Sequence, residues 1–110
     1  MKVLMTETAN GAVLKLEGKM MLGYEANDFH EAVLTAIENN KKNIVVDLSD
    51  VKFISSWGIG ILVYGYTTAT NGGGTFKLAA MPQDIKNILV KVKLDKIFEQ
   101  FETVEEALMI

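Results

Sequence analysis

The sequence predicts an α/β domain with a single mixed, mainly parallel β-sheet and helices packed against it. Segments typical of strands alternate with segments of helical spacing along the whole chain, which favours a parallel sheet. The first two strand-like segments are joined by Asn10-Gly11, a strong hairpin signal, so the sheet should begin with an antiparallel pair. Neither an internal repeat nor a linker is visible, and we expect one domain over residues 1–110.

Each predicted element has its own local signal. The short segment at 44–48 is almost wholly apolar, as expected of a central strand covered on both faces. Three consecutive glycines stop the helix that precedes them, and Thr103 with Glu106 forms a capping box. The expected strands are 2–7, 12–19, 44–48, 53–54, 75–79 and 96–101, and the expected helices are 24–39, 56–71, one that starts at Pro82 and has Ile85, Ile88, Leu89 and Val92 on its buried stripe, and one that follows Thr103.

The helix at 56–71 has two apolar sides, and they suggest different roles. At about 100° per residue, one side collects residues that we expect to face the sheet: Ile59, Leu62, Val63, Tyr66 and Thr70. Trp57, Ile61 and Tyr64 fall on nearly the opposite side. Clustered aromatic residues that face water commonly mark interaction sites, so we predict a partner-binding surface there. The alternative is that neighbouring helices cover this side.

Composition excludes several kinds of site. The chain has no cysteine, which rules out disulfides, thiolate metal sites and thiol catalysis. Its only histidine, His30, has none of the orienting partners that catalysis needs, and one histidine cannot form a His-rich metal cluster. We therefore expect neither a metal nor another cofactor.

Charge and hydropathy point to a cytoplasmic protein that contacts neither nucleic acid nor membrane. The net charge is −3 and the pI is about 5.1, whereas a nucleic-acid binder is usually basic. Lysines 86, 91, 93 and 96 are interrupted by acidic residues, which suits a solvated helix surface. The N-terminus lacks the apolar core of a secretion signal, and the apolar stretch at 59–66 is too short to span a bilayer.

Ser56 lies at the junction between a predicted buried strand and the helix that follows it. A serine there is a natural N-cap, and capping alone would explain it. The same position also favours an anion, because the first-turn amides and the helix dipole are positive. Phosphorylation would add roughly −1.5 to −2 charges that the helix tolerates but a bound partner would not. Ser56 is therefore either a cap or a phosphate-accepting switch.

The segment from Asp47 to Gly60, DLSDVKFISSWGIG, resembles the signature of STAS domains, the bacterial anti-sigma-factor antagonists. The family pattern is Asp-Leu-Ser/Gly followed by Phe-(Ile/Met)-Asp-Ser-(Ser/Thr)-Gly-Leu-Gly. The resemblance extends to Gly18 after the initial strand pair, to the glycine triplet before Phe76, and to the closing segment at 94–98. It implies a STAS fold for the whole chain.

The resemblance also implies a function. A STAS antagonist binds an anti-sigma factor that is a serine protein kinase, and so releases a sigma factor. The kinase phosphorylates the serine after the motif's Asp, which corresponds to Ser56, and a PP2C-type phosphatase resets the module. Ser55 replaces the motif's Asp and is a less favoured acceptor, and Trp57 replaces its second Ser/Thr. Such a protein is a binding module and not an enzyme.

Further departures lie in the loop after the second strand. Acidic residues that the family often carries there are replaced by Lys19 and Met21, which would alter the kinase interface or suit another partner. Met20 and Met21 could form an adaptable apolar contact with a partner, and we add them, with Ser55, to the predicted binding surface.

Two other readings stay open. The chain could be a phosphorylation-independent STAS scaffold with a different signalling partner, in which Ser56 is only a helix cap. It could also be a hydrolase with Ser55 or Ser56 as nucleophile. The absence of a Gly-x-Ser-x-Gly elbow around either serine disfavours the hydrolase.

Overall fold

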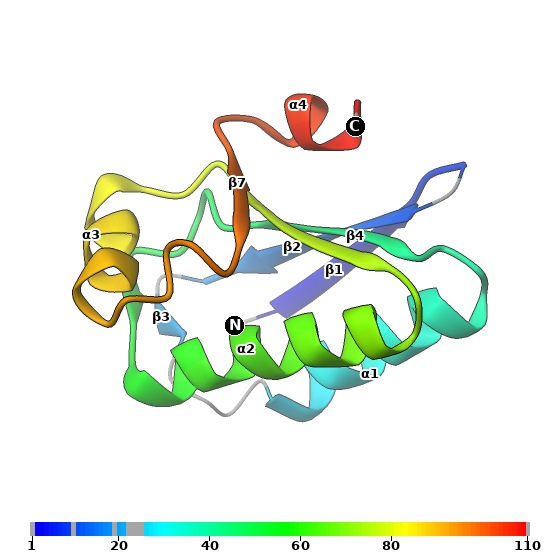
Figure 1. The fold of residues 1–110 in the computed structure, drawn as a ribbon, viewed down its shortest axis with the longest axis horizontal. Coiled ribbons are helices and arrows are strands. Elements are labelled where there is room, and N and C mark those ends of the chain that lie inside the picture. Colours follow the sequence, from blue (N-terminus) through cyan, green and yellow to red (C-terminus); the bar gives the residue numbers. More distant parts are fainter. Residues whose placement is uncertain (1, 10, 19, 22–25, 110) are drawn as a thin grey trace.

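The computed structural model describes residues 2–9, 11–18, 20–21 and 26–109 (Figure 1). Strands and helices follow the predicted alternation. In chain order they are β1 (Lys2–Glu7), β2 (Gly11–Glu17), β3 (Met20–Met21), α1 (Ala26–Glu38), β4 (Asn43–Asp47), β5 (Phe53–Ile54), α2 (Ser56–Asn71), β6 (Thr75–Ala79), α3 (Gln83–Lys91), β7 (Glu99–Phe101) and α4 (Val104–Leu108).

Five of the strands form one mixed sheet in the order β1-β2-β4-β6-β7. The β1–β2 hairpin is antiparallel, and β2, β4, β6 and β7 run parallel to one another. In the middle of the sheet, Val46 of β4 is level with Leu14 of β2 and Leu78 of β6. The predicted fold class is therefore confirmed, and so is the hairpin, although Asn10 of its connection lies outside the described residues.

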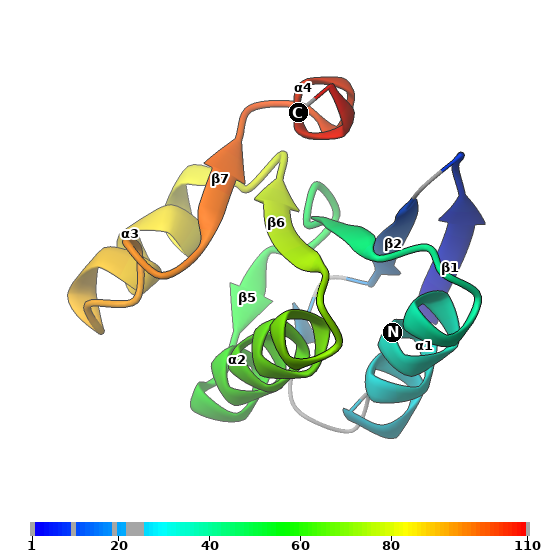
Figure 2. The ribbon, with the colours of Figure 1, turned by 45° about the vertical axis from the view of Figure 1, so that its right-hand side comes forward.

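Both views show α1 and α2 on one face of the sheet and α4 on the other (Figures 1 and 2). Because side chains alternate along a strand, Ala12, Leu14 and Leu16 all point to the helical face, and all three are fully buried. The opposite face has a smaller core in which Ala107 of α4 packs with Val45 and Ala79. The main core thus lies between the sheet and the two long helices.

Three short elements differ from the prediction. Met20 and Met21, expected in a loop, form β3, which pairs in parallel with β5 as a separate two-stranded sheet. The strand expected at 96–101 is shorter, because a turn closed by a hydrogen bond from the Ile97 N–H to the Leu94 carbonyl (3.2 Å) precedes it. Val92, predicted on a buried stripe, is 46% exposed because α3 ends one residue earlier.

Helix α2 has the predicted bounds, but its buried side is rotated from the predicted one. The side chains and glycines that face the interior are Gly58, Ile61, Leu62, Gly65 and Ala69. Gly65 explains the rotation: a Cβ added there would lie 2.7 Å from a ring carbon of Phe29 and 3.0 Å from one of Phe76. The helix therefore packs its backbone directly on two aromatic rings, which a pattern of large apolar residues does not reveal.

Candidate partner-binding site at the start of helix α2

The start of α2 is capped by Ser55 and not by Ser56. Ser55 has extended backbone angles, and its Oγ accepts a hydrogen bond of 3.0 Å from the Gly58 N–H. Its carbonyl accepts the first helical hydrogen bond, from the Ile59 N–H. This is the geometry of an N-cap residue. The expectation that Ser56 itself is the cap is therefore wrong, since the chain enters the helix one residue earlier.

Ser56 is the first residue of the helix and its side chain is exposed. Within the described chain, its hydroxyl forms no hydrogen bond. The Ser56 hydroxyl is not needed as a cap, because Ser55 Oγ already accepts the hydrogen bond from the Gly58 N–H. Ser56 is left with an accessible hydroxyl at the positive end of a helix of 16 residues.

This division of roles makes a prediction about stability. Ser55→Ala should lower the free energy of unfolding by about 1 kcal/mol, because the Gly58 amide loses its acceptor. Ser55→Asp should keep the cap and Ser56→Ala should change the stability by less than about 0.5 kcal/mol. Urea denaturation of the three variants measures the effect. An equal or larger loss in Ser56→Ala would show that Ser56 is the capping residue.

Large aromatic side chains are exposed on β5 and along the outer side of α2. Trp57 is 72% exposed, Tyr64 57% and Phe53, on β5, 47%. The sequence of α2, SWGIGILVYGYTTATN, contains no charged residue, so this outer side is uncharged. An exposed, uncharged aromatic surface is characteristic of a site that another protein covers. We refer to Phe53, Trp57 and Tyr64 as the aromatic surface.

Ile61 does not belong to this surface. It was predicted to lie beside Trp57 and Tyr64, but it is 8% exposed and packs in the main core. Its position follows from the rotation of α2 toward Gly65, which turns Ile61 inward. Phe53 was not predicted to contribute, although its place before Ile54, which points inward, would have indicated an outward side chain.

His30 of α1 extends the aromatic surface from α2 to the other long helix. Its imidazole stacks on the Tyr64 ring, with 4.5 Å between ring centroids and 9° between the planes. The Nδ1 atom of His30 is buried and has no hydrogen-bond partner in the described structure. Nothing in the sequence indicated this contact, because no local pattern links side chains on two different helices.

The backbone of the two methionines lies beside the same region. Met20 pairs with Phe53 and Met21 with Ile54. Since β5 leads directly into Ser55, β3 is a neighbour of the helix start. Lys19 lies outside the described residues.

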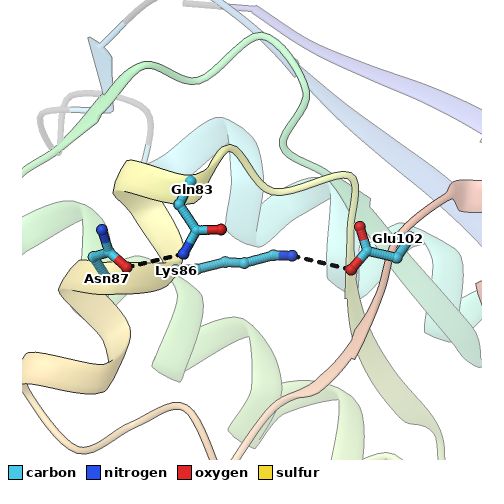
Figure 3. Close-up of polar contacts among 4 residues, drawn as sticks. All are labelled: Gln83, Lys86, Asn87 and Glu102. Carbon is cyan, nitrogen blue, oxygen red and sulfur yellow. Dashed lines mark hydrogen bonds and ion pairs between the residues drawn. The ribbon is translucent and has the colours of Figure 1, made fainter.

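Charged side chains interact in elements other than α2. In α3, Lys86 donates to Glu102 at 3.1 Å, and Gln83 donates to Asn87 at 3.0 Å (Figure 3). Glu102 is 77% exposed, so this ion pair contributes little to stability. An open depression of about 530 Å³ lies on the α4 side of the sheet and has side chains of both charges, including Lys15 and Asp47. None of the helices in the described ranges is long and apolar enough to cross a membrane.

Comparison with known proteins assigns the chain to a family. The family model for the STAS domain matches residues 3–107. The chain belongs to the STAS domain family. A curated STAS relative from Thermotoga neapolitana, named as a candidate anti-sigma factor antagonist, is 32% identical over 65 residues, which is 59% of this chain and 58% of that protein. The matched part therefore spans less than two thirds of that relative's length.

Solved structures show that the STAS fold extends over the whole chain. A candidate anti-sigma factor antagonist from Thermotoga maritima matches with a TM-score of 0.84 and 23% identity, over 97% of this chain and 92% of that one. The phosphorylated form of the Bacillus cell-fate determinant SpoIIAA matches with a TM-score of 0.75 and 17% identity, over 98% and 97%. The murine anion transporter Slc26a9 contains the same fold, matched with a TM-score of 0.75 and 16% identity over 94% of this chain but 18% of the transporter. The fold is thus shared by proteins with different roles, and function must be argued from the site.

Proposed function

We propose that this STAS domain is an anti-sigma factor antagonist that acts in the cytoplasm. Its partner is an anti-sigma factor that is also a serine protein kinase, and binding of that partner releases a sigma factor. Phosphorylation of Ser56 by the same kinase ends the interaction, and a PP2C-type phosphatase restores it. The relatives named as candidate anti-sigma factor antagonists support the type of partner.

One observation carries the proposal: an exposed serine hydroxyl, which has no hydrogen-bond partner among the described residues, begins a helix whose outer side is uncharged and carries exposed aromatic rings. A kinase can reach that hydroxyl without unfolding the domain. The helix cap is provided by Ser55, so a serine at 56 is not needed for capping. This weakens the reading in which Ser56 is only structural.

Phosphate at Ser56 would act on the interface and not on the fold. Near the N-terminus of a helix a negative charge is favourable by about 0.3–1 kcal/mol, so the domain should keep its structure. A partner covering the aromatic surface would instead have to bury that charge against neutral side chains. The replacement of the family's Asp by Ser55 does not alter this logic, because Asp and Ser are equally good N-caps.

The domain itself needs no catalytic group for this cycle. A hydrolase would require a base beside Ser55 or Ser56, and the only histidine is stacked on Tyr64 instead. Tyr64 lies eight residues beyond Ser56, or roughly 12 Å along the helix axis. The family is generally non-enzymatic, in agreement with a module that only binds.

Phosphorylation by purified serine-kinase anti-sigma factors from the source organism tests the proposal. We expect one of them, with ATP, to add a single phosphate, and peptide mapping by mass spectrometry should place it on Ser56. Ser56→Ala should stay unmodified, whereas Ser55→Ala should still accept phosphate. Modification of another residue, or of none by any of these kinases, would contradict the switch.

A further inference from the structure

Gly60 is a glycine that the fold itself does not require. It lies within α2, it is exposed, and a Cβ added to it would meet no atom of the described residues within 4 Å. Glycine in a helix interior is unfavourable relative to alanine because its unfolded chain is freer. Among the described residues, no close packing against this position accounts for a glycine.

Gly65 in the same helix shows the contrast. Its Cβ would come within 2.7 Å of Phe29 and 3.0 Å of Phe76, both of which are almost completely buried. Internal packing thus explains Gly65 and leaves Gly60 without an internal reason.

The position of Gly60 suggests a reason that lies outside the domain. It lies three residues after Trp57 and four before Tyr64, so all three share the outer side of the helix. Two exposed aromatic side chains therefore flank a stretch of bare backbone, and stacking on His30 supports the Tyr64 side. We call Trp57, Gly60 and Tyr64 the notch.

We propose that the notch is the point where the partner comes closest to α2, and that it receives an apolar, uncharged segment of the anti-sigma factor. The inference rests on the proposed function and adds the contact residue and the chemistry of the partner. Bare backbone at residue 60 lets a partner side chain or helix approach more closely than any other residue would allow. Trp57, Tyr64 and the rest of α2 carry no charge, so a charged group placed there would find no counter-charge on this helix.

The same absence of charge disfavours nucleic acid and anionic lipid, both of which are held by lysine and arginine. A second copy of this chain is the remaining competitor. It would present the same neutral surface, and the experiment below separates it from the anti-sigma factor.

Gly60→Ala separates folding from docking. Its melting temperature should rise by about 2–6 °C, because alanine stabilises the helix. The partner for the binding experiment is the purified serine-kinase anti-sigma factor of the source organism that binds the wild-type protein. Calorimetric titration should show that Gly60→Ala binds it at least about tenfold more weakly. Asn71→Ala, at an exposed position near the end of the same helix, is the matched control and should leave affinity within about twofold.

Any other result contradicts the inference, and each result identifies which part of it fails. A lower melting temperature for Gly60→Ala would show that the fold needs this glycine. A higher one with unchanged affinity, while Ser56→Asp still prevents binding, would refute the notch and leave the proposed function standing. If none of the anti-sigma factors binds the wild type, the proposed function fails and the notch falls with it. A dimer in sedimentation that Gly60→Ala dissociates, without loss of anti-sigma factor binding, would assign the notch to a second copy.

Discussion

Ser56→Asp should weaken binding of the anti-sigma factor by about two to three powers of ten, which corresponds to about 3–4 kcal/mol. The carboxylate would stand at the exposed start of α2, beside the neutral aromatic surface that we propose the partner covers. Calorimetric titration of the purified anti-sigma factor measures the loss. The melting temperature should be unchanged or slightly higher, because a negative charge is favourable in the first turn of a helix.

Ser49→Asp is the matched control, since it adds the same charge at an exposed serine that lines the depression on the α4 side of the sheet. Its affinity should remain within about twofold of the wild type, as is usual for surface substitutions outside an interface. Equal weakening by both variants would point to a long-range charge effect. Unchanged affinity in Ser56→Asp would instead favour the phosphorylation-independent scaffold.

Phe29→Ala should lower the free energy of unfolding by about 3–5 kcal/mol, a large part of the stability of a domain of this size. Phe29 is 1% exposed and meets Phe76 edge-on, with 6.3 Å between ring centroids. It also supports the backbone of α2 at Gly65. Its loss would leave a cavity between both long helices and the sheet. Urea denaturation measures the change.

Leu34→Ala in the same helix provides the comparison. Leu34 is 36% exposed, so its truncation removes less buried surface and should cost less than about 1 kcal/mol. Comparable losses in the two variants would mean that α1 does not pack on the sheet as described. A small loss for Phe29→Ala alone would mean that the core can collapse around the missing ring.

Local patterns were sufficient for the elements whose signals are contained in neighbouring residues. The alternation at 12–16 predicts the buried face of β2, and the glycine triplet predicts the end of α2. Thr103 predicts the start of α4, where its Oγ1 accepts a hydrogen bond from the Glu106 N–H. These signals work because alternation, capping and termination depend on backbone geometry over a few residues.

The candidate site was predicted only in part. Trp57 and Tyr64 are exposed as expected, since both lie on the side of α2 that faces away from the sheet. Ile61 was predicted on the wrong side because the buried side of α2 was predicted from its large apolar residues alone, without its glycines. The side that packs is defined by Gly58 and Gly65 as much as by leucine and isoleucine, because close helix packing needs small residues.

The sequence alone predicted a STAS fold with a mainly parallel sheet, and a serine where β5 passes into α2. Which of two adjacent serines caps the helix, which side of α2 faces water, and the stacking of His30 on Tyr64 were decided only by tertiary structure. The physical reason is that a periodic pattern specifies an element and its approximate faces, whereas its rotation depends on what it packs against. In α2 that rotation is set by the rings of Phe29 and Phe76 beneath Gly65, which come from two other elements of the chain.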